Sequence, residues 1–169
     1  MLALVQNISD IIKSQYTPLE LEYGIFCPKE VIEEVIKSFY TKKINSVLID
    51  VTIFADYTRF KQLVFNLISN ALKYGADNQA VNILTYMENG NFCFEITDYG
   101  EGIEEKDIEK VFDFYTQFSK DRTKRQLGSG IGLSLCKTIV ESHGGKIGVT
   151  SKIGEGSTFY FSLPAEKSR

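Results

Sequence analysis

No apolar run in this sequence approaches the roughly 18–20 residues that a helix needs to cross a bilayer. Residues 1–6 also lack the basic and then apolar pattern of a signal peptide. We therefore expect no membrane contact by this chain. Only 3 prolines interrupt it, and a hydrophobic fraction of 43% in 169 residues suffices for one folded domain with a core.

Cysteine is scarce, and its spacing excludes a disulfide framework or a zinc ribbon. The 3 cysteines, Cys27, Cys93 and Cys136, form no CxxC pair and lie among apolar neighbours. Free buried thiols in a reducing, cytoplasmic compartment are the expectation. A membrane anchor elsewhere in a longer protein stays open.

An excess of positive charge is also absent, because 19 Lys and Arg residues stand against 22 Asp and Glu and the formal net charge is −3. This excludes the overall basic field typical of nucleic-acid binding, and we expect no nucleic-acid partner. One segment departs from this average, since residues 120–125 read Lys-Asp-Arg-Thr-Lys-Arg. An anionic ligand should therefore be met locally, at this segment.

Hydrophobic periodicity and turn residues predict an alternation of helices and strands. Helices are expected over residues 2–12, 28–39, 57–74, 104–113 and 131–142. Strands are expected over residues 19–26, 44–51, 81–87, 92–97, 146–151 and 158–163. The irregular order of these elements favours an α+β fold, a two-layer α/β sandwich whose mixed sheet is covered by helices on one face.

The helix predicted at 57–74 carries polar side chains in a row. Asn66, Asn70 and Lys73 are spaced i, i+4, i+7, so they share one face beside the apolar stripe. Amide oxygens can bind a hard cation such as Mg²⁺, and the ammonium can bind phosphate. A solvated polar face is the alternative, but asparagines lower helix propensity, which favours a functional role.

Two glycine-rich segments are candidate ligand loops. Asp98-Tyr99-Gly100-Glu101-Gly102 follows a predicted strand, where a carboxylate can accept from an amino group; a plain turn is the alternative. Gly128-Ser129-Gly130-Ile131-Gly132-Leu133 opens a helix, whose first amides can face phosphates. The second segment is neither a Walker loop, because no Gly-Lys-Ser/Thr ends it, nor a Rossmann turn, because no strand runs directly into it.

In this order the segments resemble the motifs of the ATPase fold shared by histidine kinases, gyrase-type topoisomerases and Hsp90 chaperones, the Bergerat-type fold. Residues 60–74 resemble the histidine-kinase asparagine box, and 98–102 its first glycine box. Residues 112–115 resemble the phenylalanine box, with Tyr115 in place of a second Phe, and 128–133 the second glycine box. The resemblance covers about residues 19–164.

This resemblance implies ATP and Mg²⁺ as cofactors and assigns roles residue by residue. Asn70 would hold the metal with help from Asn66, Lys73 would reach the phosphates, Tyr74 would flank the nucleotide, and Asp98 would accept from the adenine amino group. Gly100 and Gly102 would admit the base. Arg122, Lys124 or Arg125 would stabilise the transferring phosphoryl group. The remaining nucleotide-site residues would be Ile103, Tyr115, Gly128, Ser129, Gly130, Ile131, Gly132, Leu133 and Ser157.

The resemblance also implies a sensor histidine kinase that passes the γ-phosphoryl group to a histidine and then to a response regulator. The single histidine, His143, lies in a segment that ends a helix, so we expect a structural role for it. Residues 1–14 resemble the tail of a dimerisation hairpin, whose acceptor histidine we expect in a longer, homodimeric protein. Residues 15–169 would form the catalytic domain, with a lid at about 114–128. A regulatory module or an ATP hydrolase of the same superfamily is the alternative function.

Overall fold

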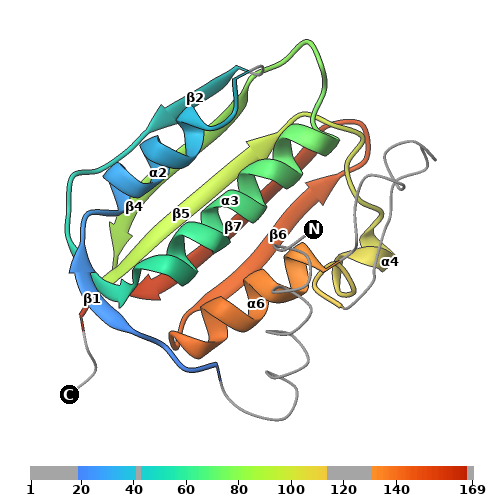
Figure 1. Cartoon of the computed structure of the whole chain (residues 1–169). Helices are drawn as coiled ribbons and strands as arrows, with labels where there is room; N and C mark the ends of the chain where they lie inside the picture. The colour runs from blue at the N-terminus through green and yellow to red at the C-terminus, as the bar shows by residue number, and fades with distance from the viewer. Residues whose placement is uncertain (1–18, 41–42, 114–130, 167–169) are drawn as a thin grey trace.

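A computed structural model describes residues 19–40, 43–113 and 131–166 (Figure 1). Its main element is a five-stranded sheet in the order β2–β4–β5–β7–β6. The strands are β2 (Ile44–Val47), β4 (Val81–Glu88), β5 (Asn91–Asp98), β7 (Gly156–Pro164) and β6 (Lys146–Lys152). Strand β2 runs parallel to β4 and the other neighbours are antiparallel, so the sheet is mixed, as predicted.

Helices α2 (Pro28–Lys37), α3 (Tyr57–Tyr74) and α6 (Gly132–Ser142) lie side by side over one face of this sheet (Figure 1). Alternate strand residues point into this layer: on β5 Phe92, Phe94 and Ile96 are fully buried. Neighbouring strands place Leu84 and Tyr160 on the opposite face, where both are exposed. The predicted two-layer sandwich is therefore confirmed.

A two-stranded ribbon, β1 (Tyr23–Phe26) with β3 (Ile53–Asp56), lies outside the main sheet. Strand β1 is shorter than the predicted 19–26, and β3 was not predicted at all. Four residues are too few to establish an alternating pattern, and β3 pairs with a strand far away in the sequence. Tertiary pairing therefore decides this element.

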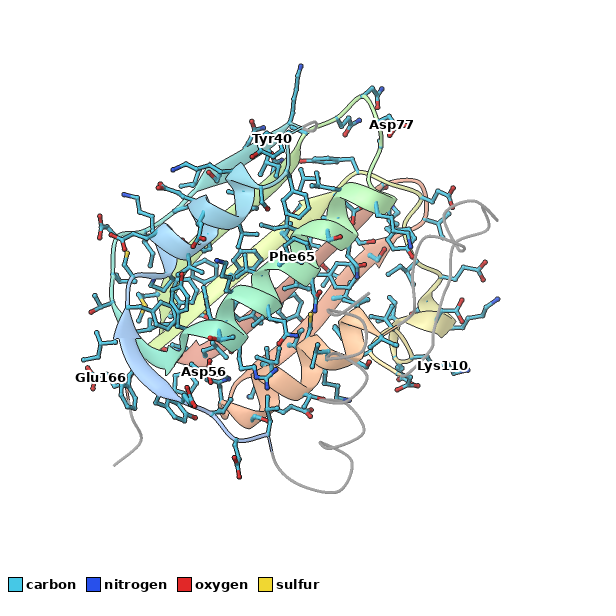
Figure 2. The ribbon with its side chains drawn as sticks, in the orientation of Figure 1. Tyr40, Asp56, Phe65, Asp77, Lys110 and Glu166 are labelled. Atoms are coloured by element: carbon cyan, nitrogen blue, oxygen red, sulfur yellow. The ribbon has the colours of Figure 1, made fainter. Side chains whose placement is uncertain are left out.

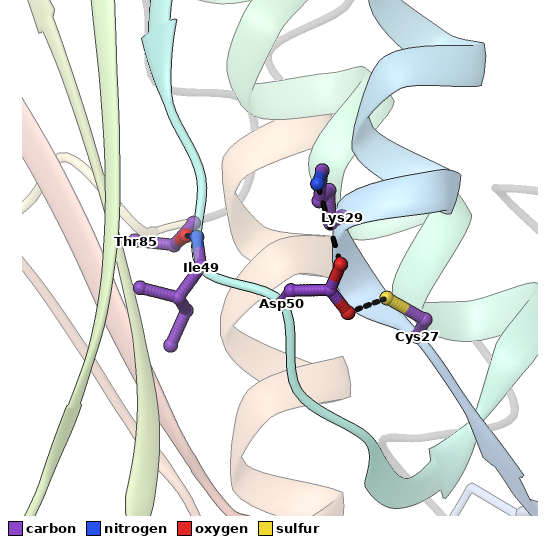
Figure 3. Close-up of polar contacts among 5 residues, drawn as sticks. All are labelled: Cys27, Lys29, Ile49, Asp50 and Thr85. Carbon is purple, nitrogen blue, oxygen red and sulfur yellow. Dashed lines mark hydrogen bonds and ion pairs between the residues drawn. The ribbon is translucent and has the colours of Figure 1, made fainter.

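The strand predicted over 44–51 was too long, because the chain leaves the sheet after Val47. Beyond that point the Ile49 amide donates to the Thr85 side-chain hydroxyl over 2.9 Å instead of to a strand backbone (Figure 3). Asp50 then turns to α2, where its carboxylate lies 3.4 Å from Lys29 Nζ and 3.9 Å from Cys27 Sγ. These side-chain contacts replace the sheet ladder and redirect the chain toward β3.

Helix α3 begins and ends at the residues predicted from sequence. Asp56, labelled in Figure 2, is its N-cap. Its Oδ1 accepts from the Arg59 amide at 2.9 Å and its Oδ2 from the Glu22 amide at 2.8 Å. Gly75 follows the last turn and donates to the Ala71 carbonyl. The predicted core stripe is buried throughout: Phe60, Val64, Leu67, Ile68 and Ala71.

His143 fastens the end of α6 to the start of α3. It is 8% exposed; its Nε2 accepts from the Asp56 amide at 3.1 Å and its Nδ1 lies 2.8 Å from the Ile139 carbonyl oxygen. Accepting at Nε2 requires the proton on Nδ1, so the ring is neutral. Burial lowers its pKa, although the Ile139 bond and the nearby Asp56 carboxylate act the other way. The predicted structural role of His143 agrees with these contacts.

Every described residue with a positive backbone angle φ, except Asn89, is a glycine. Asn89 and Gly90 have φ of 49° and 77°, which confirms the predicted tight turn between β4 and β5. Gly144, with φ of 74°, closes α6 as predicted.

Helix α4 (Glu105–Ile108) is shorter than the predicted 104–113, because tighter i to i−3 hydrogen bonds continue from Lys110 to Asp113.

The cysteine prediction holds for two of the three side chains. Cys93 and Cys136 are buried free thiols, whereas Cys27 is only half-buried because it precedes α2 at the edge of the helical layer. Within the described ranges, no helix combines the length and apolar character needed to traverse a bilayer.

Candidate functional site

The described candidate residues meet at one end of the molecule, where α3 and β5 end and β7 begins (Figure 1). Asp98 at the end of β5 pairs with Ser157 on β7. A Cβ atom built on Gly75, just after α3, would lie 3.4 Å from Asp98 Cβ. A Cβ atom on Gly132, at the start of α6, would lie 3.9 Å from Asn66 Cγ. The structure therefore joins four separate sequence segments at this end.

Asn66 faces the start of α6 with a buried amide. Among the residues that the structure describes, its Nδ2 has no hydrogen-bond partner. Burial raises the pKa of the neighbouring Cys136 thiol to about 12, and a hydrogen bond from the Asn66 amide to the thiolate form opposes this rise. The neutral thiol donates instead to the Leu63 carbonyl at 3.9 Å, which leaves Asn66 Nδ2 without a partner within the described part of the chain. A buried donor without an acceptor costs about 1–3 kcal/mol. A phosphate oxygen would satisfy this donor, and the amide oxygen of the same residue suits Mg²⁺.

The next residues of this helix face continue toward the end of α3. Asn70 is half-buried one turn after Asn66. Lys73 Nζ donates to Tyr74 Oη at 2.8 Å and lies 4.6 Å from the centre of its ring. The ammonium group is therefore held at the end of α3 in this structure. Sequence spacing predicted the shared face of these residues but not the contact with Tyr74.

Asp98 is a buried carboxylate, 3% exposed, at the point where β5 leaves the sheet. Its Oδ1 accepts from the Gly100 amide at 2.9 Å, which closes the turn after the strand. This bond fixes the rotation of the carboxyl group. A buried carboxylate held in this way is a strong acceptor for a ligand amino group.

The glycines of this loop are required by backbone packing. A Cβ atom on Gly100 would lie 2.0 Å from the Tyr74 carbonyl oxygen, and one on Gly102 would lie 2.2 Å from that of Lys152. Gly102 also has a positive φ of 73°. On β7, Gly156 has φ of 102°, and its Cβ would lie 2.1 Å from the Asp98 carbonyl oxygen. From the sequence, the glycines at 100 and 102 were attributed to a ligand. The close approach of three backbone segments explains why glycine is needed at these positions.

The start of β7 is tied to the loop by hydroxyl groups. Ser157 is 6% exposed, and its Oγ lies 2.9 Å from Ser151 Oγ on β6. Ser151 Oγ in turn accepts from the Ile103 amide at 2.8 Å. The predicted site residues Ser157 and Ile103 are thus joined through Ser151, which sequence reasoning did not select. The hairpin register was the signal, because residues 151 and 157 face each other across the turn.

Helix α6 begins at Gly132, and Ile131 supplies no side-chain cap for its first amides. Such amides and the helix dipole favour an anion. Ile131 is 4% exposed and its side chain lies in the core, with Leu133 packed against the same core. Only backbone atoms of Ile131 are therefore available to a ligand, which narrows the predicted role of this residue.

The other predicted site residues lie outside the described residues. They are Tyr115, Arg122, Lys124, Arg125, Gly128, Ser129 and Gly130. The predicted lid at 114–128 and the helix over residues 2–12 also lie outside them.

Comparison with known sequences identifies a family. The family described as histidine kinase-, DNA gyrase B-, and HSP90-like ATPase matches residues 55–167. The sensor protein KdpD of Clostridium acetobutylicum is 34% identical over 98% of this chain and 19% of its own length. The chain spans between 19% and 31% of the length of three curated relatives that it matches.

Solved structures give the same result for the fold. The catalytic domain of histidine kinase ThkA superposes with a TM-score of 0.72 at 28% identity, over 86% of this chain and 97% of that domain. Full-length ShkA, solved in complex with AMPPNP, superposes with a TM-score of 0.84 over 99% of this chain and 36% of ShkA. Because ShkA is only 22% identical, that likeness shows the shared fold alone.

The family match contains α3, the loop after β5, α6 and the β6–β7 hairpin, which are the elements that form the candidate site. The chain belongs to the histidine kinase-, DNA gyrase B- and HSP90-like ATPase family, as a catalytic ATP-binding domain of the sensor histidine kinase type.

Proposed function

We propose that this domain binds Mg-ATP between α3 and the start of α6 and donates the γ-phosphoryl group to a histidine on a separate dimerisation hairpin. The observation that carries this proposal is the buried Asn66 Nδ2, which has no acceptor in the described structure and faces the first turn of α6. A triphosphate between these elements would satisfy the donor. Mg²⁺, when bound, would neutralise phosphate charge during transfer.

Each end of the nucleotide would meet different chemistry. Asp98 would accept from the adenine amino group at the closed end of β5, where its carboxylate is already oriented by Gly100. Asn70 and Asn66 would offer amide oxygens to the metal. Lys73 would move from Tyr74 to the phosphates, since its contact with the neutral Tyr74 hydroxyl is half-buried and an anionic phosphate is a stronger acceptor.

The basic segment would complete the phosphate end. We propose that Arg122, Lys124 or Arg125 stabilises the transferring phosphoryl charge, and that residues 114–128 with the glycines at 128, 130 and 132 cover the triphosphate. The remaining proposed contacts are Tyr115, Ser129, Ile103, Ser157 and the backbone of Ile131 and Leu133.

The phosphoacceptor would come from outside this domain. The only histidine, His143, uses both ring nitrogens inside the fold and is 8% exposed. Phosphoryl transfer needs donor and acceptor in line and within a few ångströms. We therefore propose residues 1–14 as the tail of a dimerisation hairpin that bears the acceptor, in a homodimeric cytoplasmic kinase unit that passes phosphate to a response regulator receiver domain.

ATP hydrolysis is the second candidate from the same superfamily, but one feature disfavours it. A hydrolase needs a general base near the attacking water. The residue one helical turn before Asn70 is Asn66, and an amide is a very weak base. A nucleotide-binding regulatory module would share the ATP site and lack the transfer.

Labelling with γ-phosphate-labelled ATP tests the proposal. The chain alone should bind Mg-ATP in calorimetry and incorporate no label. Joined downstream of a histidine-bearing dimerisation hairpin, it should label the hairpin with an acid-labile, base-stable phosphohistidine. A matched hairpin with its histidine replaced by glutamine is the control. Acid-labile label on the chain alone that disappears in His143→Gln would overturn the proposed acceptor.

A further inference from the structure

Ser151 holds three backbone segments together at the end of the site where Asp98 lies. Ser151 is the second-to-last residue of β6, and its Oγ accepts from the Ile103 amide at 2.8 Å. The same oxygen donates to the Gly156 carbonyl at 2.9 Å and lies 2.9 Å from Ser157 Oγ. One half-buried hydroxyl therefore bonds to the loop after β5 and to two residues of β7.

Counting protons assigns a direction to each of these bonds. A serine hydroxyl has one proton to donate and two lone pairs that accept. The proton of Ser151 goes to the Gly156 carbonyl, and one lone pair takes the Ile103 amide. The second lone pair must then accept from Ser157. The hydroxyl proton of Ser157 is consequently donated to Ser151. Toward any other group, Ser157 Oγ can act only as a hydrogen-bond acceptor.

The segments joined by Ser151 are also in direct backbone contact. The Gly154 amide donates to the Glu101 carbonyl at 2.8 Å. A Cβ atom on Gly102 would lie only 2.2 Å from the Lys152 carbonyl oxygen. The bond from the Ile103 amide to Ser151 Oγ also joins this loop to the hairpin, and its acceptor is a side chain. It is therefore the contact that a substitution can remove without changing the backbone path.

We propose that Ser151 is a positioning residue that sets the base selectivity of the site by keeping Ser157 an acceptor. This inference rests on the proposed nucleotide site. Ser157 stands opposite Asp98 in the ladder between β5 and β7. Two acceptors at this place favour a base that presents an amino group and disfavour one that presents a carbonyl oxygen.

Replacing the Ser151 hydroxyl should change selectivity in a defined direction. In Ser151→Ala the Ser157 hydroxyl has lost its acceptor, Ser151 Oγ, and can rotate so that it donates its proton to a ligand. It can then donate to the 6-oxygen of inosine diphosphate, which carries oxygen where ADP has the amino group. The ratio of the two dissociation constants, inosine diphosphate over ADP, should fall by about three- to tenfold, the range of one hydrogen bond.

Matched variants separate this effect from a loss of folding. Ser151→Thr keeps a hydroxyl and should restore the wild-type ratio. Thr150→Ala removes an exposed hydroxyl from the opposite face of β6 and should leave the ratio unchanged. A partly unfolded variant weakens both ligands equally, so the ratio is insensitive to it. In a Ser157→Ala background, Ser151→Ala should have no further effect on the ratio.

Calorimetry with both diphosphates gives the ratio, and exchange of the Ile103 amide in the nucleotide-free protein gives an independent readout. Exchange should be slow in wild type and in Ser151→Thr, and fast in Ser151→Ala. An unchanged ratio in Ser151→Ala, or an equal fall in Ser151→Thr, overturns the selectivity role. Slow Ile103 exchange in Ser151→Ala overturns the positioning role. A wild-type chain that binds neither diphosphate refutes the proposed function instead, while Ile103 exchange still decides the positioning role.

Discussion

Asp98→Asn is the substitution that most directly tests the proposed contact between Asp98 and the adenine amino group. The variant keeps the shape of a side chain that is only 3% exposed, so the fold should survive. It replaces one oxygen by an NH₂ group, and the Gly100 amide, 2.9 Å from Oδ1, limits how the new amide can turn. If the amide oxygen stays on Gly100, the NH₂ group takes the place of the oxygen that we propose accepts from the adenine amino group. If it turns, the NH₂ group faces the Gly100 amide.

Either orientation sets two donors against each other, which gives a magnitude for the loss. A hydrogen bond to a charged acceptor contributes about 1.5–3 kcal/mol. Since about 1.4 kcal/mol corresponds to tenfold in affinity, ADP binding should weaken by about 10- to 150-fold. The loss should be smaller for inosine diphosphate, because its 6-oxygen can accept from the new NH₂ group.

Isothermal titration calorimetry with ADP measures this loss. Glu95→Gln is the matched control, because it makes the same chemical change on the same strand, on the face where Glu95 bonds to the Tyr86 hydroxyl. The control should bind ADP like wild type. Unchanged ADP affinity in Asp98→Asn, with an unchanged thermal midpoint, would refute the assignment of Asp98 to the adenine amino group.

Three further substitutions test other parts of the structure. Asn70→Ala should weaken ADP binding more with Mg²⁺ than with a chelator, because it removes an oxygen ligand; equal losses in the two titrations would contradict a metal role. Gly100→Ala should lower the free energy of unfolding in urea by about 1–3 kcal/mol, since its Cβ would lie 2.0 Å from the Tyr74 carbonyl oxygen. An unchanged urea midpoint would exclude that packing. His143→Leu leaves the Asp56 amide without its acceptor and should cost about 1–3 kcal/mol near pH 7.5. Burial lowers the pKa of His143 in the folded state, so the unfolded chain binds the proton first as pH falls. The contribution of neutral His143 to the free energy of unfolding should therefore be complete above the unfolded pKa of about 6.5 and be lost as the pH falls below it. If the free energies of unfolding in urea of wild type and variant change in parallel from pH 7.5 to 5.5, this prediction is wrong.

Local patterns predicted the elements that carry their own signal. Helix α3 has an apolar stripe, an N-cap at Asp56 and a stop at Gly75, and all three agree with the structure. The turn at Asn89 and Gly90 was equally well marked, because few residue pairs adopt positive φ at both positions. The shared face of Asn66 and Asn70 followed from helical spacing alone.

Long-range contacts were beyond these patterns. Strand β3 exists through pairing with β1, and the end of β2 depends on a side chain of β4, Thr85. Ser151 reads as an ordinary strand serine until the hairpin register places it beside Ser157. The glycines at 100 and 102 were recognised, but their cause was not, because the backbone that approaches them comes from distant segments.

The glycine contacts around Asp98 have a thermodynamic consequence. The end of α3, the loop after β5 and the turn before β7 approach one another as backbone, at positions where a Cβ atom would lie within 2.0–2.2 Å of a carbonyl oxygen. Such close packing limits the arrangements that the loop can adopt before a ligand binds. Recognition of the base would then have the calorimetric signature of a preorganised receptor. Its heat-capacity change would contain no contribution from coupled folding of the loop after β5.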